Sequence, residues 1–153
     1  MPAKRLIASS VAAVILGSAA ATAQDVTAAV EARQGQFKLY AFNLGALVPM
    51  AQGNVDYDAE VAQAAADNLA LLTALDQTRL WPEGSDNAAI DGTRALPVIW
   101  EDMAALEARF GELQDAVATL QNAAGEDLDS MRAALGPVGG VCSACHEANR
   151  APE

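Results

Sequence analysis

Apolar residues three and four positions apart over residues 97–120 constrain the fold of this chain more than any other feature. The side chains on this pattern are Ile99, Met103, Leu106, Phe110, Leu113, Val117 and Leu120. Such steps keep side chains on one face of an α-helix, and their alternation makes a heptad seam. The pattern predicts a helix that begins near Pro97, a residue suited to a first helical turn.

Three further stretches have helical periodicity, and no stretch has the alternation of a strand. The first runs from about residue 25 to 48, and Pro49 ends it or closely follows its end. The second spans about 57 to 78, with Asp56 as its expected N-cap. The fourth starts near Glu126 and contains Pro137, which should kink the helix or divide it in two. The side chains expected to face inward are Val26, Val30, Arg33, Phe37, Ala41, Leu44 and Val48 in the first; Val61, Ala65, Leu69, Leu72 and Leu75 in the second; and Leu128, Met131, Leu135, Val138, Cys142 and Cys145 in the fourth.

Four helices joined by short turns and one longer loop, residues 79–96, predict an all-α fold. The expected architecture is an antiparallel, up-down-up-down four-helix bundle. We expect one domain from residue 24 to 153, preceded by a cleaved secretory signal peptide at residues 1–23. Lys4 and Arg5 form its basic start, residues 6–20 its apolar segment, and residues 21–23 an A-x-A cleavage site. A membrane anchor is the alternative, but the apolar run is short and is followed directly by Gln24 and Asp25.

The fourth stretch ends in the motif Cys142-Ser143-Ala144-Cys145-His146. C-x-x-C-H is the attachment signature of c-type haem. Two thiols at this spacing can form thioethers to the two vinyl groups of one porphyrin, and the next histidine can bind the iron. No other cysteine or histidine occurs in the chain. We therefore expect one covalent haem c, held by Cys142 and Cys145 on the apolar seam, with His146 as the metal ligand.

Three other interpretations of the motif are weaker. A thioredoxin-like dithiol needs a surrounding βαβ pattern, which is absent. A structural zinc site needs four protein ligands, and the chain has no second Cys/His pair. Two merely buried cysteines would not explain the adjacent histidine in an exported protein. Export also supports haem, because bacteria attach it outside the cytoplasm, so we expect a periplasmic location.

The charge of the expected mature chain excludes two classes of partner. The leader holds two of the nine basic residues and none of the twenty acidic ones, so the remaining 130 residues carry a net charge of −13. Such a surface repels nucleic acid and anionic membranes. It favours a basic partner protein or simple solubility.

His146 is the only histidine, so a second protein ligand on the iron could only be methionine or another weak ligand. Met50, Met103 and Met131 remain after removal of the leader. Met103 and Met131 lie on apolar seams and are expected to be packing residues, and Met50, at the far end of the first helix, is not expected to bind the iron. The sequence therefore favours an open sixth position on the iron.

Four other residues are candidates for the site, each with an ordinary structural alternative. Arg33 interrupts an apolar stripe, so it either meets a haem propionate or pairs with a carboxylate such as Glu31. Phe37, one turn later, is either an apolar lid over the iron or a core aromatic. Trp81 is a second aromatic wall or a packed loop residue. Arg150, four residues after His146, lies beside the imidazole on the same helical face or is exposed at a frayed end.

With these residues assembled, the chain resembles cytochrome c′, the high-spin class II c-type cytochromes. The resemblance covers essentially all of the mature chain. It rests on the C-terminal C-x-x-C-H-x-x-x-R, on Arg33 with an apolar residue four positions later, and on residues 93–100, Thr-Arg-Ala-Leu-Pro-Val-Ile-Trp. Asn149, Val98 and Pro137 depart from the usual pattern of the family.

The resemblance implies roles for the matching residues. Cys142 and Cys145 would carry the thioethers, His146 the proximal bond, and Arg150 a place near the proximal face. Arg33 would point toward a propionate, and Thr93 belongs to the cofactor-binding stretch. In the family, methionine four residues after this arginine gives six-coordinate iron, whereas leucine or phenylalanine leaves it five-coordinate. Phe37 therefore favours five-coordinate, high-spin iron.

The expected function is electron transfer, binding of nitric oxide, or both, with a small redox protein as partner. The alternative is a six-coordinate, methionine-ligated carrier of electrons only. An enzyme such as a peroxidase would need polar distal groups, usually a second histidine. The chain has no second histidine, so we expect no enzymatic activity. Storage of dioxygen is also disfavoured, because Phe37 offers no hydrogen bond. Alanine-rich faces and the resemblance together make a homodimer plausible.

Overall fold

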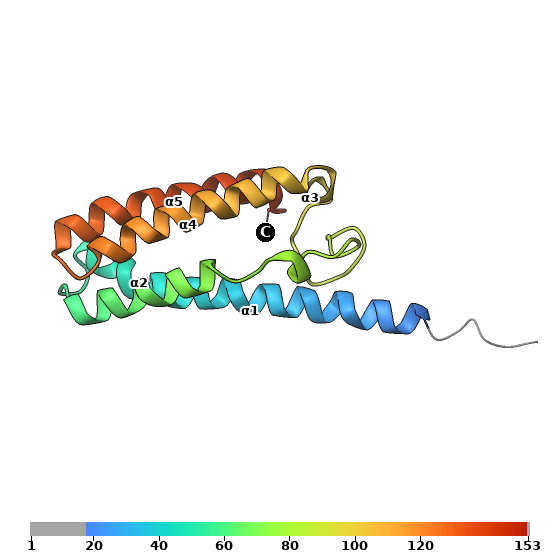
Figure 1. The fold of residues 1–153 in the computed structure, drawn as a ribbon, viewed down its shortest axis with the longest axis horizontal. Coiled ribbons are helices and arrows are strands. Elements are labelled where there is room, and N and C mark those ends of the chain that lie inside the picture. The colour runs from blue at the N-terminus through green and yellow to red at the C-terminus, as the bar shows by residue number, and fades with distance from the viewer. Residues whose placement is uncertain (1–17, 153) are drawn as a thin grey trace, which may run out of the picture.

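The computed structural model describes residues 18–152, and their side chains from residue 26 onward. Its order of elements is α1 (Ser18–Gln52), α2 (Ala59–Thr73), the 3-10 turn η1 (Thr78–Leu80), α3 (Val98–Glu101), α4 (Met103–Ala123) and α5 (Leu128–Asn149). Figure 1 shows α1 and α2 in one layer and α4 and α5 in the other, in the predicted up-down-up-down order. No helix in the described residues is long and apolar enough to cross a membrane.

The predicted leader lies mostly outside the described part of the chain, which begins at Ser18 within α1. The cleavage after Ala23 therefore stays a prediction. At its other end α1 runs past Pro49, so the prediction that this proline ends the helix was wrong. Gly53, at a φ of 74°, donates its N–H to the Met50 carbonyl, and Asn54 donates to the Pro49 carbonyl. These two bonds form a Schellman motif that ends α1 one turn later than predicted.

The buried face of α1 differs from the predicted stripe after Arg33. The buried residues are Ala29, Val30, Arg33, Gln36, Tyr40, Asn43, Leu47 and Met50. Phe37, Ala41 and Val48, predicted to face inward, are exposed. The prediction failed because it left polar residues out of the stripe, whereas Gln36 and Asn43 are buried with hydrogen-bond partners. Buried amides are stable where such partners exist.

Helix α2 is shorter than predicted at both ends. Its N-cap is Asp58, not Asp56, because the Asp58 carboxylate accepts from the N–H groups of Glu60 and Val61. At the other end, the Leu72 carbonyl accepts hydrogen bonds from Gln36 Nε2 and Tyr40 Oη of α1. That carbonyl would accept from residue 76 if the helix continued. The helix stops at Thr73, and Val61 and Leu75 are exposed rather than inward-facing.

The predicted third helix is divided into α3 and α4 at Asp102. This residue has φ −144°, and its carboxylate accepts from the Ala105 N–H, so it caps a new helix. The heptad seam is confirmed: Ile99, Leu106, Leu113, Val117 and Leu120 are all buried. Met103 and Phe110 are partly buried.

Helix α5 begins after its N-cap Asp127 and runs through Pro137 without being divided. Ala134 and Val138, on either side of this proline, are buried, and α5 packs along α4 more than along any other helix. That packing keeps α5 as one helix, so the predicted division at Pro137 is wrong, while the kink given as the other possibility stays a prediction. The seam of α5 is confirmed, with Met131 and Val138 buried and Cys142 packed against the core.

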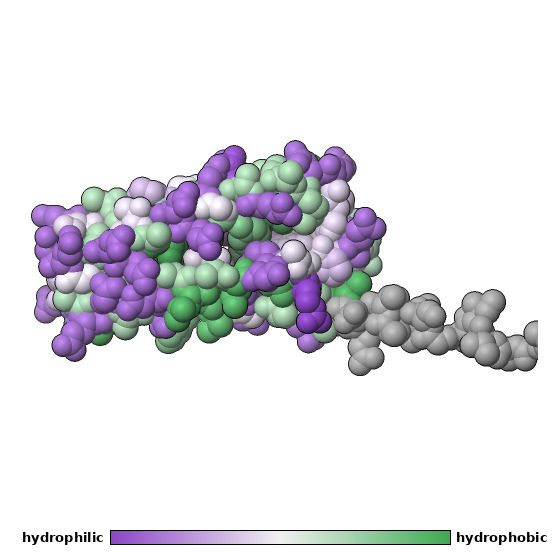
Figure 2. Space-filling view, in the orientation of Figure 1, coloured by the Kyte–Doolittle hydropathy of each residue, from purple (hydrophilic) through white to green (hydrophobic). Residues whose placement is uncertain are grey.

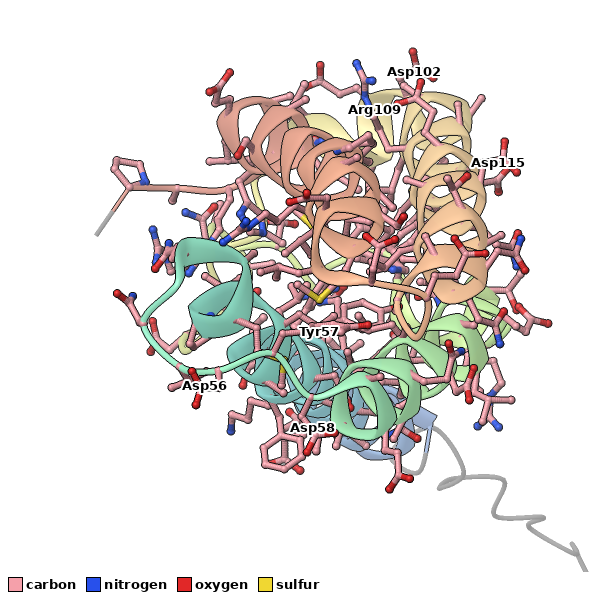
Figure 3. All side chains as sticks on the ribbon, turned by 90° about the vertical axis from the view of Figure 1, so that its left-hand side faces the viewer. Asp56, Tyr57, Asp58, Asp102, Arg109 and Asp115 are labelled. Atoms are coloured by element: carbon pink, nitrogen blue, oxygen red, sulfur yellow. The ribbon has the colours of Figure 1, made fainter. Side chains whose placement is uncertain are left out.

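The turn between α1 and α2 is joined to the turn between α4 and α5 by Tyr57. Its hydroxyl donates to the Ala124 carbonyl at 2.8 Å. Figure 3, which looks onto this end of the bundle, shows Asp56 and Asp58 on either side of Tyr57 along the turn. Burial, followed by the charges of Asp127, Asp58 and Glu126, raises the pKa of Tyr57. The hydroxyl therefore stays protonated and remains a donor across this end.

Candidate haem site

The last two turns of α5 carry the C-x-x-C-H motif. Cys142 and Cys145 are both free thiols and both partly buried, and Cys142 packs against the core. Asn149 places its side-chain nitrogen 3.7 Å from the sulfur of Cys145. His146 is exposed. Positions 142, 145 and 146 turn toward neighbouring directions of one helix, so thiols and imidazole can serve one flat ligand.

The ionisation of these groups reflects their surroundings. Burial, and then the neighbouring Cys145, raises the pKa of the Cys142 thiol. Desolvation, then the guanidinium groups of Arg150 and Arg94, lowers the pKa of His146. A lowered pKa keeps the imidazole neutral at physiological pH, and the neutral form is the one that binds metals. Within residues 26–152, no cluster of His, Cys, Asp and Glu could hold a bare metal ion.

The middle of α1 faces this end of α5. The charge of Cys142 contributes to the raised pKa of Tyr40, about 12, although burial is its main cause. The Tyr40 ring contacts Phe37 edge-on, with ring centres 5.6 Å apart. Phe37 keeps 37% of its surface exposed. It lies on the open side of the buried stripe rather than within the core.

Trp81 is at the centre of an aromatic cluster next to Phe37. Its ring centre lies 6.5 Å from that of Phe37, 6.1 Å from Trp100 and 6.0 Å from Phe110. Trp100 Nε1 donates to the Trp81 carbonyl. Trp81 Nε1 is buried and has no hydrogen-bond partner among the described residues. The predicted second aromatic wall thus lies next to the predicted lid.

Arg33 is only 3% exposed and is held by the loop that follows η1. Its Nη1 donates to the Leu80 carbonyl and to Ser85 Oγ, and its Nη2 donates to the Ser85 carbonyl and to Thr93 Oγ1. Its carbon Cζ also lies 4.3 Å from the centre of the Trp81 ring. All four acceptors are neutral, so the alternative of a pair with Glu31 is not what the structure shows. Burial lowers the pKa of Arg33 to about 10.

The prediction that Arg150 shares a helical face with His146 was wrong, because α5 ends at Asn149. Arg150 has extended backbone angles and forms an antiparallel bridge with Ala95. Its N–H still donates to the His146 carbonyl at 3.0 Å, and its charge lowers the pKa of His146. The exposed guanidinium of Arg150 therefore lies close enough to the imidazole to lower its pKa, although the two residues do not share a helical face.

Sequence reasoning missed Gln36, Tyr40 and Arg94. Gln36 Nε2 donates to Tyr40 Oη at 2.7 Å, and both groups reach the Leu72 carbonyl. For Gln36 and Tyr40 the signal was present in the sequence, because both continue the three- and four-residue steps that start at Val30 and Arg33. Met131 is a buried core residue, as predicted, and Met50 is buried in the core as well. Met103 lines a groove between the end of α2 and α4.

Comparison with known proteins decides the family. A family model described as Cytochrome C′ matches residues 28–150. The chain is 41% identical over 129 residues to the cytochrome c′ of Cereibacter sphaeroides, across 84% of this chain and 87% of the relative. The chain belongs to the cytochrome c′ family.

Solved structures agree with this assignment. The cytochrome c′ from Rhodobacter spheriodes superposes with a TM-score of 0.81 at 38% identity, over 84% of this chain and 98% of that one. A ferrous variant of cytochrome c′ from Alcaligenes xylosoxidans with bound NO superposes with a TM-score of 0.72 at 34% identity. It covers 84% of this chain and 97% of that one. The likeness therefore extends over the whole bundle.

The residues present fit haem c, which members of the cytochrome c′ family bind covalently. The donor set is right, because two free thiols and an imidazole lie together at the end of α5. The loop that bonds to the end of α5 also holds Arg33, a buried guanidinium that meets no carboxylate within residues 26–152, beside Trp81, whose N–H has no partner there. Both features suit the carboxylates of a haem. This chain is therefore a haem c protein of electron transfer or gas binding. Its haem is attached through Cys142 and Cys145.

Proposed function

We propose that this cytochrome c′ is a periplasmic, non-enzymatic protein that binds haem iron through His146 alone, binds nitric oxide on the open side, and also transfers electrons. Haem c, when bound, supplies an iron that changes between ferrous and ferric states and accepts a diatomic ligand. The observation that carries the proposal is the position of Phe37, an aromatic residue that contacts Tyr40 and Trp81 on the part of α1 facing Cys142. Phenylalanine cannot bind iron.

The surroundings of Phe37 favour nitric oxide over dioxygen. The hydroxyl of Tyr40, whose ring contacts Phe37, donates to the Leu72 carbonyl and so is already used. Bound dioxygen needs a hydrogen-bond donor in the distal pocket, whereas nitric oxide binds ferrous haem without one. A structural relative from Alcaligenes xylosoxidans holds NO, which supports the same ligand here.

We further propose that Arg33, Trp81 and Thr93 form the surroundings of a haem propionate. The two Nη atoms of Arg33 already donate to loop oxygens, including Thr93 Oγ1. Its contribution is therefore a fixed positive charge, while Trp81 Nε1 offers the free donor. A buried donor without a partner is costly, so an accepting carboxylate would stabilise this end of the bundle.

The first experiment records the optical and EPR spectra of the purified holoprotein, oxidised and reduced, with and without nitric oxide. A high-spin spectrum that changes on addition of the gas is the expected result. A low-spin spectrum that ignores the gas would mean that a methionine binds the iron. That outcome would establish the alternative, a six-coordinate electron carrier.

Substitution of Phe37 sharpens the experiment. Phe37→Met should place a sulfur on the iron and convert the ferric spectrum to low-spin, because the new side chain reaches the same place with a ligand atom. Phe37→Leu is the matched control and should stay high-spin. An unchanged spin state in Phe37→Met would show that residue 37 does not lie over the iron.

Export is tested on the same purified protein. Mass spectrometry of the mature chain should give an N-terminus at Gln24, and cell fractionation should place the protein in the periplasm. A redox partner with a basic surface is expected, because the mature chain, residues 24–153, carries a net charge of −13 and opposite charges accelerate the encounter of two proteins. Its binding rate should therefore fall as salt is raised.

We also propose that a second copy of the chain covers an apolar strip on α1 and α2. Phe42 and Leu71, which expose 78% and 71% of their surfaces, form the strip together with Leu39 and Leu75. Figure 2 shows apolar surface gathered over α1 and the C-terminal part of α2. Asn68 of α2 donates to Asn43 of α1, which confirms that these two faces adjoin. The strip carries no charge, so the acidic chains could meet there without direct repulsion.

Sedimentation velocity tests this proposal. The wild-type protein should sediment as a dimer, and Phe42→Glu should convert it to a monomer without changing the haem spectrum. Val55→Glu, at an exposed apolar residue of the turn between α1 and α2, is the matched control and should leave the dimer intact. A monomeric wild-type protein would refute the proposal.

A further inference from the structure

The long loop between η1 and α3 is attached on one side to α1. Arg33 donates three hydrogen bonds to Ser85 and Thr93 of the loop and one to Leu80 at the end of η1, and Gln34 Nε2 donates to the Gly92 carbonyl at 2.6 Å. Within the loop, the Asn87 N–H donates to the Ala95 carbonyl. These bonds make the loop part of the α1 side of the site.

The other side of the same loop is attached to the residues that follow His146. The Leu96 N–H donates to the Asn149 carbonyl at 2.9 Å, and the Ala151 N–H donates to the Arg94 carbonyl at 2.8 Å. Arg94 then closes this short ladder with its side chain, because Nε and Nη2 both donate to the Ala151 carbonyl, at 2.8 and 2.5 Å. A forked, charge-assisted contact of this kind fixes direction as well as distance.

The end of α5 depends on this attachment. Helix ends fray unless something ties them down, and His146 lies in the last turn. Helix α5 packs on α1 much less than on α4, so direct helix contacts do little to hold its end to the α1 side. In Figure 1 the chain end lies between the two layers, beside the loop that leads to α3.

We propose that Arg94 is a positioning residue for His146: by holding the Ala151 carbonyl, it fixes the last turn of α5 to the loop and so fixes the direction of the imidazole. The inference rests on the proposed function, which assigns His146 to the iron. The loop then joins the helix with Phe37 to the helix with His146. It sets the two sides of the haem at a constant separation.

Amide hydrogen exchange of the holoprotein tests the attachment without reference to the iron. In Arg94→Gln, the N–H groups of Leu96, Arg150 and Ala151 should exchange about tenfold faster, as expected for loss of one charge-assisted contact. The amide of Val138, inside α5, should be unchanged. Arg94→Lys keeps the charge but not the fork, so it should also exchange faster than wild type. Arg109→Gln, at an exposed arginine of α4, is the control and should match wild type.

Resonance Raman spectroscopy of the reduced holoprotein tests the effect on the histidine. Arg94→Gln should shift or broaden the iron–histidine stretching band, whereas Arg109→Gln should not. Wild-type exchange rates in Arg94→Gln, or in Arg94→Lys, would overturn the role of the fork. Faster exchange with an unchanged band would overturn the positioning of His146. Absence of the band from the wild-type protein would instead refute the proposed function, while the exchange rates would still report on the attachment.

Discussion

The two ends of the bundle are filled by different kinds of side chain. At the end with the turns around Tyr57 and Gly125, the fully buried residues are apolar, among them Leu47, Leu120 and Met131. At the end with the cysteines, the buried positions of α1 include the polar side chains of Arg33, Gln36 and Tyr40 beside the small apolar Ala29 and Val30. The three buried side-chain atoms without a partner in the described chain, Gln36 Oε1, Gln77 Oε1 and Trp81 Nε1, all belong to this second end.

This difference separates stability from function. An unpartnered buried polar group costs about 1–3 kcal/mol, so the second end gives up stability that an apolar core would provide. The first end is filled by buried apolar side chains from all four long helices. We therefore expect substitutions at the first end to change unfolding and those at the second end to change the haem.

The largest effect is expected from Leu120→Ala in the apolar end. Removal of a fully buried leucine side chain should lower the free energy of unfolding by about 2–5 kcal/mol. The haem spectrum of the folded variant should match wild type. Val55→Ala, at an exposed residue outside the strip proposed for the dimer, is the control and should change stability by about 0.5 kcal/mol or less. An altered spectrum in Leu120→Ala would show that the two ends are not independent.

A smaller effect is expected from Tyr40→Phe at the other end. Loss of the hydrogen bond to the Leu72 carbonyl should lower stability by about 1 kcal/mol at pH 7. The pKa of Tyr40 is raised from 10.0 to about 12 in the folded protein, so above pH 10 the unfolded chain loses this proton first. Ionisation then favours unfolding, and stability should fall between pH 10 and 12.

Denaturant unfolding at several alkaline pH values isolates this contribution, because Tyr40→Phe has no proton to lose at position 40. The difference in stability between wild type and variant should shrink as the pH rises from 10 toward 12. A difference that stays constant over this range would mean that Tyr40 titrates alike in the folded and unfolded chains.

The smallest effect is expected from Gly140→Ala in α5. A methyl group built on Gly140 meets nothing within 4 Å, and alanine stabilises a helix interior by about 0.5–1 kcal/mol. Gly111→Ala in α4 has the same open surroundings and should stabilise equally. Thermal unfolding measures both. Haem uptake that falls only in Gly140→Ala would show that the ring approaches this glycine.

The parts of the fold that could be predicted are those where one helix face is uniformly apolar. The seam of α4 follows directly from its side chains, and the C-x-x-C-H motif identifies its cofactor by itself. The buried face of α1 could not be read in this way, because Gln36 and Asn43 are buried by hydrogen bonds to other elements. The end of α2 depends on the Leu72 carbonyl, whose partners lie on α1. No local sequence pattern predicts the pairing of Ala95 with Arg150, because the two residues lie far apart in the sequence.

The early end of α2 shapes the groove between the end of this helix and α4. Helix α2 has 15 residues against 21 in α4, a difference of about 9 Å at 1.5 Å per residue. Over that length one corner of the bundle is built by loop and aromatic side chains instead of by a helix. The groove at this corner is lined by Trp81, Met103 and Phe110 together with residues that follow Thr73. Insertions or deletions after Thr73 should therefore change the size of this groove while Cys142, Cys145 and His146 are kept.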